Sequence, residues 1–494
     1  MLASGPPVAQ QERRYSRPMT ETVDFGVIVL IVALGFTLSV GASKLTERFP
    51  LPGPAVFLLA AAAASDIFPG LSAISIRDVE RIGVVALIMI LFDGGMHVGW
   101  RRFRGAAVEI TILGVVGTFA TAGLMAVFAH ALFGFGWTAA GIVGAALAPT
   151  DPAVMFSVLG KHEVGGRSGT ILEGESGAND PVGIALMLGM LEFATHEHAT
   201  FWVVVREFAI EMSVGLAIGV FGALVLLQLM RRVMLPNEAL YPLRTLAFAG
   251  VIYGVASVAH GSGFLAVFVA GLLVGDARAP HKGEIERFHT SLASLAEVVV
   301  FAALGLTIDL QSLGRGRLWL DGLWLALLLA FVARPVVVAP LLARTRLRAG
   351  ERLFVIWGGL KGAVPILLGS FVLLEHLPEG SRIYGIVFVV VAFSVLVQGT
   401  SIPFVAPRLG IPMRLAEPRG VQRYVVRAGS HAAERRLGDL PLGTGTWIQE
   451  VIRDGEAVPL DGALSLLPGD EVVAVVSDVG DARGLARVFA GTRA

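Results

Sequence analysis

Uncharged apolar runs of about 20 residues alternate with short polar segments over most of the chain. About 20 apolar residues are needed for a helix to cross the hydrocarbon core of a bilayer, so this pattern predicts an all-α polytopic membrane protein. About thirteen transmembrane helices are expected, at residues 23–41, 52–68, 81–98, 107–133, 137–159, 169–194, 202–230, 242–259, 261–276, 289–309, 319–343, 352–374 and 383–405.

Two of the expected spans contain helix-breaking residues. Ala148-Pro149-Thr150-Asp151-Pro152 interrupts span 137–159, and Gly358-Gly359-Leu360-Lys361-Gly362 interrupts span 352–374. Breaks at matching positions of two halves are typical of the discontinuous helices that bind substrates in transporters. We therefore expect two repeats, spans one to six and spans eight to thirteen. One span between them makes the repeats inverted.

The segment 171–190 begins with polar residues and ends with apolar ones. Its polar half carries Glu173, Glu175, Ser176, Asn179 and Asp180. An acid in the middle of a membrane helix costs about 2.5–3.5 kcal/mol, which marks it as a candidate functional group. On a helix, Ser176 and Asp180 share one face. Their oxygen atoms suit a hard cation or a proton, whereas the alternative is a polar seam between helices.

Other polar residues fall within the expected spans. A buried Asp180 carboxyl favours binding a proton or a cation, so the two would compete for it. Thr150 and Asp151 lie at a break, where free backbone carbonyls add ligands. Lys361 at the other break would offset exposed carbonyl groups or pair with an acid.

Two further ionisable residues are expected inside the membrane. Arg334 lies within a span and needs a carboxylate, for which Glu175 is the natural partner. Asp93 is a further intramembrane acid, either a cation ligand or a structural acid near a helix end.

The loops and the tail give the orientation. Loops after odd-numbered spans hold far more Lys and Arg than loops after even-numbered spans, which predicts a cytoplasmic C-terminus. Residues 23–407 form the expected membrane domain, and residues 1–22 an N-terminal disordered tail that lacks a signal peptide. Residues 415–494 are charged and loop-rich, with a strand pattern over 471–477 and a short helix over 484–489. They predict a small cytoplasmic α+β domain.

Composition narrows the function further. Of 494 residues, 55% are hydrophobic and 16% charged, and the net charge is zero, so nothing points to nucleic acid. The chain has no cysteine, which excludes disulfides and thiolate metal sites.

Several motifs resemble those of one transporter class. They are DGGM at 93–96, ESGANDP at 175–181, GSGFLAV at 261–267, FVARP at 331–335, GLKGAVPILL at 359–368 and QGTS at 398–401. In this order they are similar to the monovalent cation/proton antiporters of the CPA1 class, closest to the NhaP-type potassium/proton branch. The tail is similar to the C-terminal ligand-binding domain of RCK (TrkA-C) regulators.

The resemblance implies a secondary antiporter rather than an enzyme, acting in the inner membrane of a bacterium. It implies that Asp180 exchanges a proton for K⁺ or Na⁺ with support from Asn179. Ser176 and the Thr150 region would be cation ligands, and a Glu175–Arg334 ion pair would hold the helices. It also implies electroneutral exchange, no cofactor or bound metal, a homodimer, and a small cytosolic ligand for the tail. Lys361 departs from the arginine that the family usually has.

Two other functions fit parts of the sequence. Gly166-Arg167-Ser168-Gly169 matches a short motif of intramembrane serine proteases, but we expect no histidine near Ser168. A ligand-gated cation channel would also suit an RCK-like tail, although no carbonyl-filter sequence such as TVGYG occurs.

Overall fold

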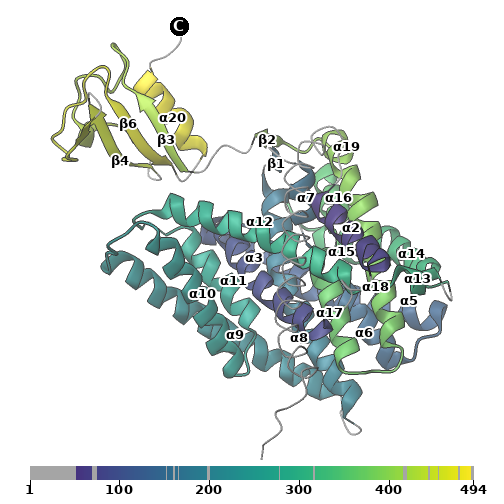
Figure 1. The fold of residues 1–494 in the computed structure, drawn as a ribbon. Helices are drawn as coiled ribbons and strands as arrows, with labels where there is room; N and C mark the ends of the chain where they lie inside the picture. The colour runs from purple at the N-terminus through teal and green to yellow at the C-terminus, as the bar shows by residue number, and fades with distance from the viewer. Residues whose placement is uncertain are drawn as a thin grey trace, which may run out of the picture.

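The computed structural model describes most of the chain after residue 51. The described residues are 52–68, 75–151, 153–159, 162–164, 166–196, 201–277, 279–314, 317–415, 420–442, 446–453, 456–476 and 479–490. The expected tail 1–22 and first span 23–41 lie outside them. The chain is mostly helical, and Figure 1 shows the helices packed into one body, with a small sheet near the C-terminus.

The helices follow the apolar runs closely. The first group is α2 (Gly53–Ile67), α3 (Ile76–Gly105), α4 (Ala107–Thr111), the π-helical turn η2 (Ile112–Gly117), α5 (Thr118–Phe133), α6 (Trp137–Leu147), α7 (Ala153–Leu159), α8 (Arg167–Thr195), α9 (Phe201–Arg232) and α10 (Leu240–Val258). The second is α11 (Gly263–Gly275), α12 (Lys282–Leu306), α13 (Leu310–Gly314), α14 (Leu318–Leu328), η3 (Leu329–Ala333), α15 (Arg334–Leu342), α16 (Ala349–Trp357), α17 (Ala363–Leu374), α18 (Gly380–Phe393), η4 (Ser394–Gly399) and α19 (Thr400–Arg408).

Seven stretches of the described chain are helices long and apolar enough to cross a bilayer. They are 76–105, 107–133, 202–232, 240–258, 282–306, 318–342 and 380–408. The other expected spans within the described chain differ in form: α6–α7 and α16–α17 are each broken into short helices, and α2 and α11 are short throughout. α8 is long but polar in its first half.

A sharp turn separates α10 from α11, where the sequence offered only two residues as a boundary. His260 adopts a left-handed backbone conformation with φ 57°. Ser262 then caps α11, because its side chain accepts a hydrogen bond from the N–H of Leu265 at 3.3 Å. The two runs therefore form separate helices.

α8 packs at the centre of the helical body, against α3, α6, α9, α11, α16 and α17. Its small residues permit this closeness: a Cβ at Gly183 would overlap the ring of Pro149, and one at Gly177 would overlap the ring of Phe268. Glycines allow such close approach of helices inside a membrane. The polar half of α8 is thereby brought against the break that follows α6.

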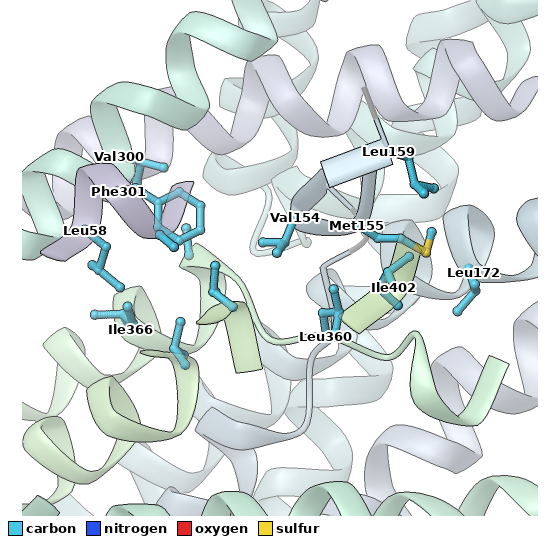
Figure 2. Close-up of a cluster of buried hydrophobic side chains, with 14 of the residues drawn as sticks. Leu58, Val154, Met155, Leu159, Leu172, Val300, Phe301, Leu360, Ile366 and Ile402 are labelled. Carbon is cyan, nitrogen blue, oxygen red and sulfur yellow. The ribbon is translucent and has the colours of Figure 1, made fainter. Parts of the chain in front are cut away.

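Apolar packing holds the broken helices in place. Figure 2 shows Val154 and Met155 of α7 in one buried cluster with Leu172 of α8 and Leu360, which lies in the break between α16 and α17. Phe301 of α12 belongs to the same cluster. Burying an apolar side chain of this size contributes about 1.5–3 kcal/mol. The breaks are therefore fixed by side-chain packing where helical hydrogen bonds are missing.

Two short strands join distant parts of the chain. β1 (His162–Val164), which lies between α7 and α8, pairs antiparallel with β2 (Met413–Leu415), which follows α19. The sequence did not predict this pairing, because each strand is three residues long and the partners are far apart.

The C-terminal segment folds into a sheet with one helix. β3 (Gly420–Val425), β4 (Thr446–Arg453), β5 (Glu456–Val458) and β6 (Glu471–Val476) form an antiparallel sheet in the order β3-β6-β4-β5, and α20 (Val479–Ala490) follows. Val472 of β6 and Phe489 of α20 lie in its buried core. Arg453 donates two hydrogen bonds to the buried Asp470, of 2.8 and 2.7 Å, which fix the turn before β6.

Candidate functional site

The two breaks meet each other and are linked by Lys361. Its Nζ donates hydrogen bonds to the carbonyls of Ala148 and Pro149, both at 2.8 Å, and its side chain is buried. The Asp151 N–H donates to the Leu360 carbonyl at 2.8 Å. The last carbonyls of a helix lack helical partners and carry partial negative charge, so the lysine satisfies the C-terminal end of α6.

Asp180 lies on α8 beside this crossing. Only 5% of the residue is exposed, and its Oδ1 is buried without a hydrogen-bond partner among the described residues. Asp151 and Lys361 are the charged groups that interact with it electrostatically. A buried oxygen without a donor is costly unless a proton or a cation binds it. The carboxyl can therefore bind either a proton or a cation.

Asn179 and Thr150 hold each other across the same contact. The Nδ2 of Asn179 donates to the Thr150 hydroxyl at 2.7 Å, and the Thr150 N–H donates to Oδ1 of Asn179 at 3.2 Å. Ser176 is also buried, one helical turn before Asp180 on the same face of α8. The oxygen atoms of Thr150 and Ser176 thus belong to the elements that surround Asp180.

Glu175 and Arg334 form a buried ion pair between α8 and α15. Two guanidinium nitrogens donate to the two carboxylate oxygens at 2.6 and 2.9 Å, a bidentate arrangement. Arg334 also donates to the carbonyls of Ile356 and Val355 at 3.4 and 3.3 Å, near the end of α16. A Cβ at Gly359 would overlap the guanidinium. One arginine thereby joins three helices beside the break.

Asp93 makes its contacts elsewhere, between α3 and α12. Its Oδ1 accepts a hydrogen bond from the Thr290 hydroxyl at 3.1 Å, and its Oδ2 lies 3.2 Å from Nδ1 of His97. The structure therefore groups Thr150, Asp151, Ser176, Asn179, Asp180 and Lys361 around one crossing. The hydrogen bond between Asp93 and Thr290 joins α3 to α12 instead.

Glu297 was missed by the sequence reasoning. It lies on α12, its Oε1 is buried without a hydrogen-bond partner in the described part of the chain, and it interacts electrostatically with Asp151. The signal was present: Glu297 is the one charged residue between Leu292 and Leu306. A single acid leaves the apolar pattern of the expected span 289–309 intact.

Ser168 shows none of the surroundings of a catalytic serine. Its hydroxyl is buried and has no hydrogen-bond partner among the residues that the structure describes. A serine nucleophile needs a base within hydrogen-bond reach. The geometry gives no support to the protease alternative.

Comparison with known proteins identifies what this arrangement resembles. Residues 29–407 match the family model described as "Sodium/hydrogen exchanger, transmembrane". The K⁺/H⁺ antiporter NhaP of Alkalimonas amylolytica is 32% identical over 452 residues, which cover 87% of this chain and 77% of that protein. The K⁺/H⁺ antiporter NhaP2 of Shewanella sp. strain ANA-3 is 29% identical, covering 93% and 83%.

A solved structure shares the fold. The sodium proton antiporter MjNhaP1 from Methanocaldococcus jannaschii superposes with a TM-score of 0.66 at 22% identity, covering 78% of this chain and 99% of that one. Together these matches confirm the family that the motifs indicated. The family match ends at residue 407 and does not include the tail.

Proposed function

Because this chain belongs to the sodium/hydrogen exchanger family, we propose that it exchanges K⁺ or Na⁺ for H⁺ across a bacterial inner membrane, with Asp180 binding the cation and the proton in turn. The observation that carries this proposal is the Asp180 carboxyl, buried beside two broken helices with one oxygen unpartnered. Such a group is neutralised by one monovalent ion at a time, which couples the two fluxes.

The neighbouring residues have distinct roles in the proposed exchange. Ser176, Thr150 and Asp151 supply oxygen ligands to the cation next to Asp180. Asn179 holds Thr150 in place through their two hydrogen bonds. Lys361 neutralises the carbonyl end of α6, so the site does not bind a second cation there. Glu175 and Arg334 keep α8, α15 and the end of α16 together.

Asp93 has a different role in this proposal. Its hydrogen bond with Thr290 ties α3 to α12, its contact with His97 lies within α3, and it would bind a cation outside the group around Asp180. We propose that it is a cation ligand on the route to the crossing.

The choice between K⁺ and Na⁺ follows the relatives. The proteins of Alkalimonas and Shewanella are named K⁺/H⁺ antiporters, whereas a protein of Aphanothece halophytica that is 25% identical is named a Na⁺/H⁺ antiporter. We propose K⁺ as the preferred cation, with one-for-one exchange.

The wider architecture follows from the same family. We propose about thirteen spans in two inverted repeats, whose broken helices α6–α7 and α16–α17 cross at the site. The membrane domain would span residues 23–407 and form a homodimer, one bundle moving against a dimerisation bundle. Residues 415–494 would form a cytoplasmic α+β domain similar to RCK C-terminal regulators, with a small cytosolic ligand. A ligand-gated channel remains the alternative function for such a tail.

Replacing Asp180 tests the function directly. We expect Asp180→Asn to abolish exchange while the protein still folds, because the amide has the same shape but takes up no proton. The measurement is cation-driven alkalinisation or acidification of proteoliposomes that contain a pH dye, with K⁺, Na⁺ and Li⁺ in turn.

Asp309→Asn is a matched control for this change. Asp309 is exposed after α12 and its Oδ1 accepts from the Ser312 N–H at 3.0 Å, an acceptor that asparagine retains. This variant should exchange as the wild type does. Exchange in Asp180→Asn that survives at the wild-type rate would refute the assignment, and cation flux without proton movement would favour a channel.

A further inference from the structure

A second unpartnered carboxyl lies in the membrane domain, at Glu297 of α12. Its Oε1 is buried without a hydrogen-bond partner in the described chain, yet the residue as a whole is only half-buried. Asp180, in contrast, is fully enclosed. Ionisable residues within spans face a bundle interior or a water-filled cavity, and they mark ion pathways. Glu297 is therefore a second candidate residue on an ion pathway, besides Asp180.

Asp151 is the charged group that acts on Glu297. α12 packs against α2, α3, α10 and α17, and the described part of α17 carries no ionisable residue. On the other three helices, Asp66 of α2 accepts from the Leu310 N–H, Arg81 of α3 lies near Asp78, and Asp93 of α3 accepts from the Thr290 hydroxyl. None of these three is among the charged groups that act on Glu297.

Charged residues on α10 and β3, which also pack against α12, have partners of their own. Arg244 of α10 donates to the carbonyls of Leu229 and Val233, and Arg423 of β3 pairs with Glu471. On α12 itself, Lys282 pairs with Glu286 more than two helical turns before Glu297. The electrostatic neighbour that matters is thus Asp151, a residue of the crossing.

Oδ1 of Asp180 and Oε1 of Glu297, two carboxyl oxygens of the membrane domain, are buried without a hydrogen-bond partner among the described residues. A buried carboxyl oxygen without a donor is costly unless a proton or a cation binds it. Glu297 therefore offers a second place for a proton when a K⁺ ion occupies Asp180.

We propose that Glu297 is a second proton-carrying residue of the exchange, which strengthens cation binding when it is ionised and weakens it when it is protonated. This inference rests on the proposed antiport. In its ionised form the carboxylate adds negative charge beside Asp151 and attracts the cation. In its protonated form, with the proton taken from water, that attraction is lost.

The test compares apparent KM for K⁺ at a series of pH values in proteoliposomes. Glu297→Gln imitates the protonated form. It should match the wild type at the most acidic pH and show an apparent KM about tenfold higher at the most alkaline pH, the size expected for one unit charge acting across several ångströms of protein. Glu297→Asp should restore most of the pH dependence, since it keeps the carboxyl.

Glu375→Gln is the control, because Glu375 is exposed just after α17 and should leave the apparent KM unchanged at every pH. A KM ratio between Glu297→Gln and wild type that is constant across pH, or equal to one throughout, overturns the inference. Wild-type protein without exchange would instead refute the proposed function, so the two failures are distinguishable.

A second measurement tests the proposal even if a variant reconstitutes poorly into proteoliposomes. K⁺-induced thermal stabilisation in detergent reports cation binding without transport, since a ligand of the folded state raises its stability. The stabilisation of Glu297→Gln should fall below that of the wild type only at alkaline pH. A loss of equal size at all pH values would indicate a structural role and contradict the proposal.

Discussion

At the scale of single residues, one buried acid of the site, Glu175, forms an ion pair, whereas the other, Asp180, has an oxygen without a hydrogen-bond partner among the described residues. Glu175 and Arg334 satisfy each other with two hydrogen bonds, and the arginine also reaches two carbonyls. Oδ1 of Asp180 accepts no hydrogen bond from the described residues. A paired buried ion stabilises a geometry, whereas an open one binds a mobile ion. The two acids lie five positions apart on one helix and have opposite tasks.

Breaking the ion pair should destabilise the protein. Glu175→Ala or Arg334→Ala leaves one buried charge without its partner, which typically costs about 3–5 kcal/mol. The double variant should recover part of that loss, because neither charge remains. Thermal unfolding in detergent measures the stability of the two single variants and the double variant. If the loss in the double variant equals the sum of the two single losses, the pairing is contradicted.

Arg81→Ala provides the comparison for an exposed pair. Arg81 lies 3.8 Å from Asp78, and both side chains are exposed. Exposed ion pairs contribute about 0–1 kcal/mol, so this variant should unfold within a degree or two of the wild type.

At the scale of elements, the sequence predicted the spans well and their contacts poorly. The expected span 107–133 coincides with α4, η2 and α5, and Pro149 and Gly358 correctly marked the broken helices. The contact of Lys361 with the carbonyls of Ala148 and Pro149 was not predicted, because it joins backbone groups more than 200 positions away. Apolar periodicity shows where a helix lies, but it does not show which neighbour satisfies its end.

The C-terminal sheet depends on one acid in a turn. The Arg453 guanidinium lowers the pKa of the Asp470 carboxyl from its ordinary value, aided by the Leu467 N–H. A lowered pKa in the folded state means that the ionised form stabilises folding above the ordinary Asp value, near 3.9. This contribution is lost as the pH falls through the folded-state pKa.

Asp470→Asn should therefore weaken the sheet at neutral pH and not at strongly acidic pH. We expect a loss on the order of 1 kcal/mol, because the charge-assisted hydrogen bonds become neutral ones. Hydrogen exchange of the β4 and β6 amides in the full-length protein measures it at each pH against the wild type. A difference between the two proteins that persists unchanged at the lowest pH would contradict this account.

At the scale of the whole molecule, the pairing of β1 with β2 connects the start of the C-terminal segment to the helix that carries Asp180. β2 precedes the C-terminal sheet and pairs with β1, which leads directly into α8. α8 carries Asp180. A ligand on the sheet needs only about 1.4 kcal/mol of differential affinity to shift two transport states tenfold.

Truncating the tail tests its proposed regulatory role. A chain that ends after Leu415 keeps β2 and should still exchange cations for protons, with a changed pH profile. A chain that ends after Ile411 also loses β2 and should show a larger change. The measurement is the pH profile of exchange for all three proteins in matched vesicles, with and without added nucleotides. Identical profiles would remove the regulatory role, and loss of exchange in both truncations would make the tail structural.

The pairing of β1 with β2 also bears on how the protein is made. Synthesis proceeds from the N-terminus, so β1 leaves the ribosome long before its partner. The pairing closes a loop of about 250 residues, a number set by the positions of the two strands. It forms only after α19, the helix that precedes β2, has been synthesised. The small sheet is therefore a late step of assembly, and a nascent chain released before residue 413 leaves the strand next to α8 without its partner.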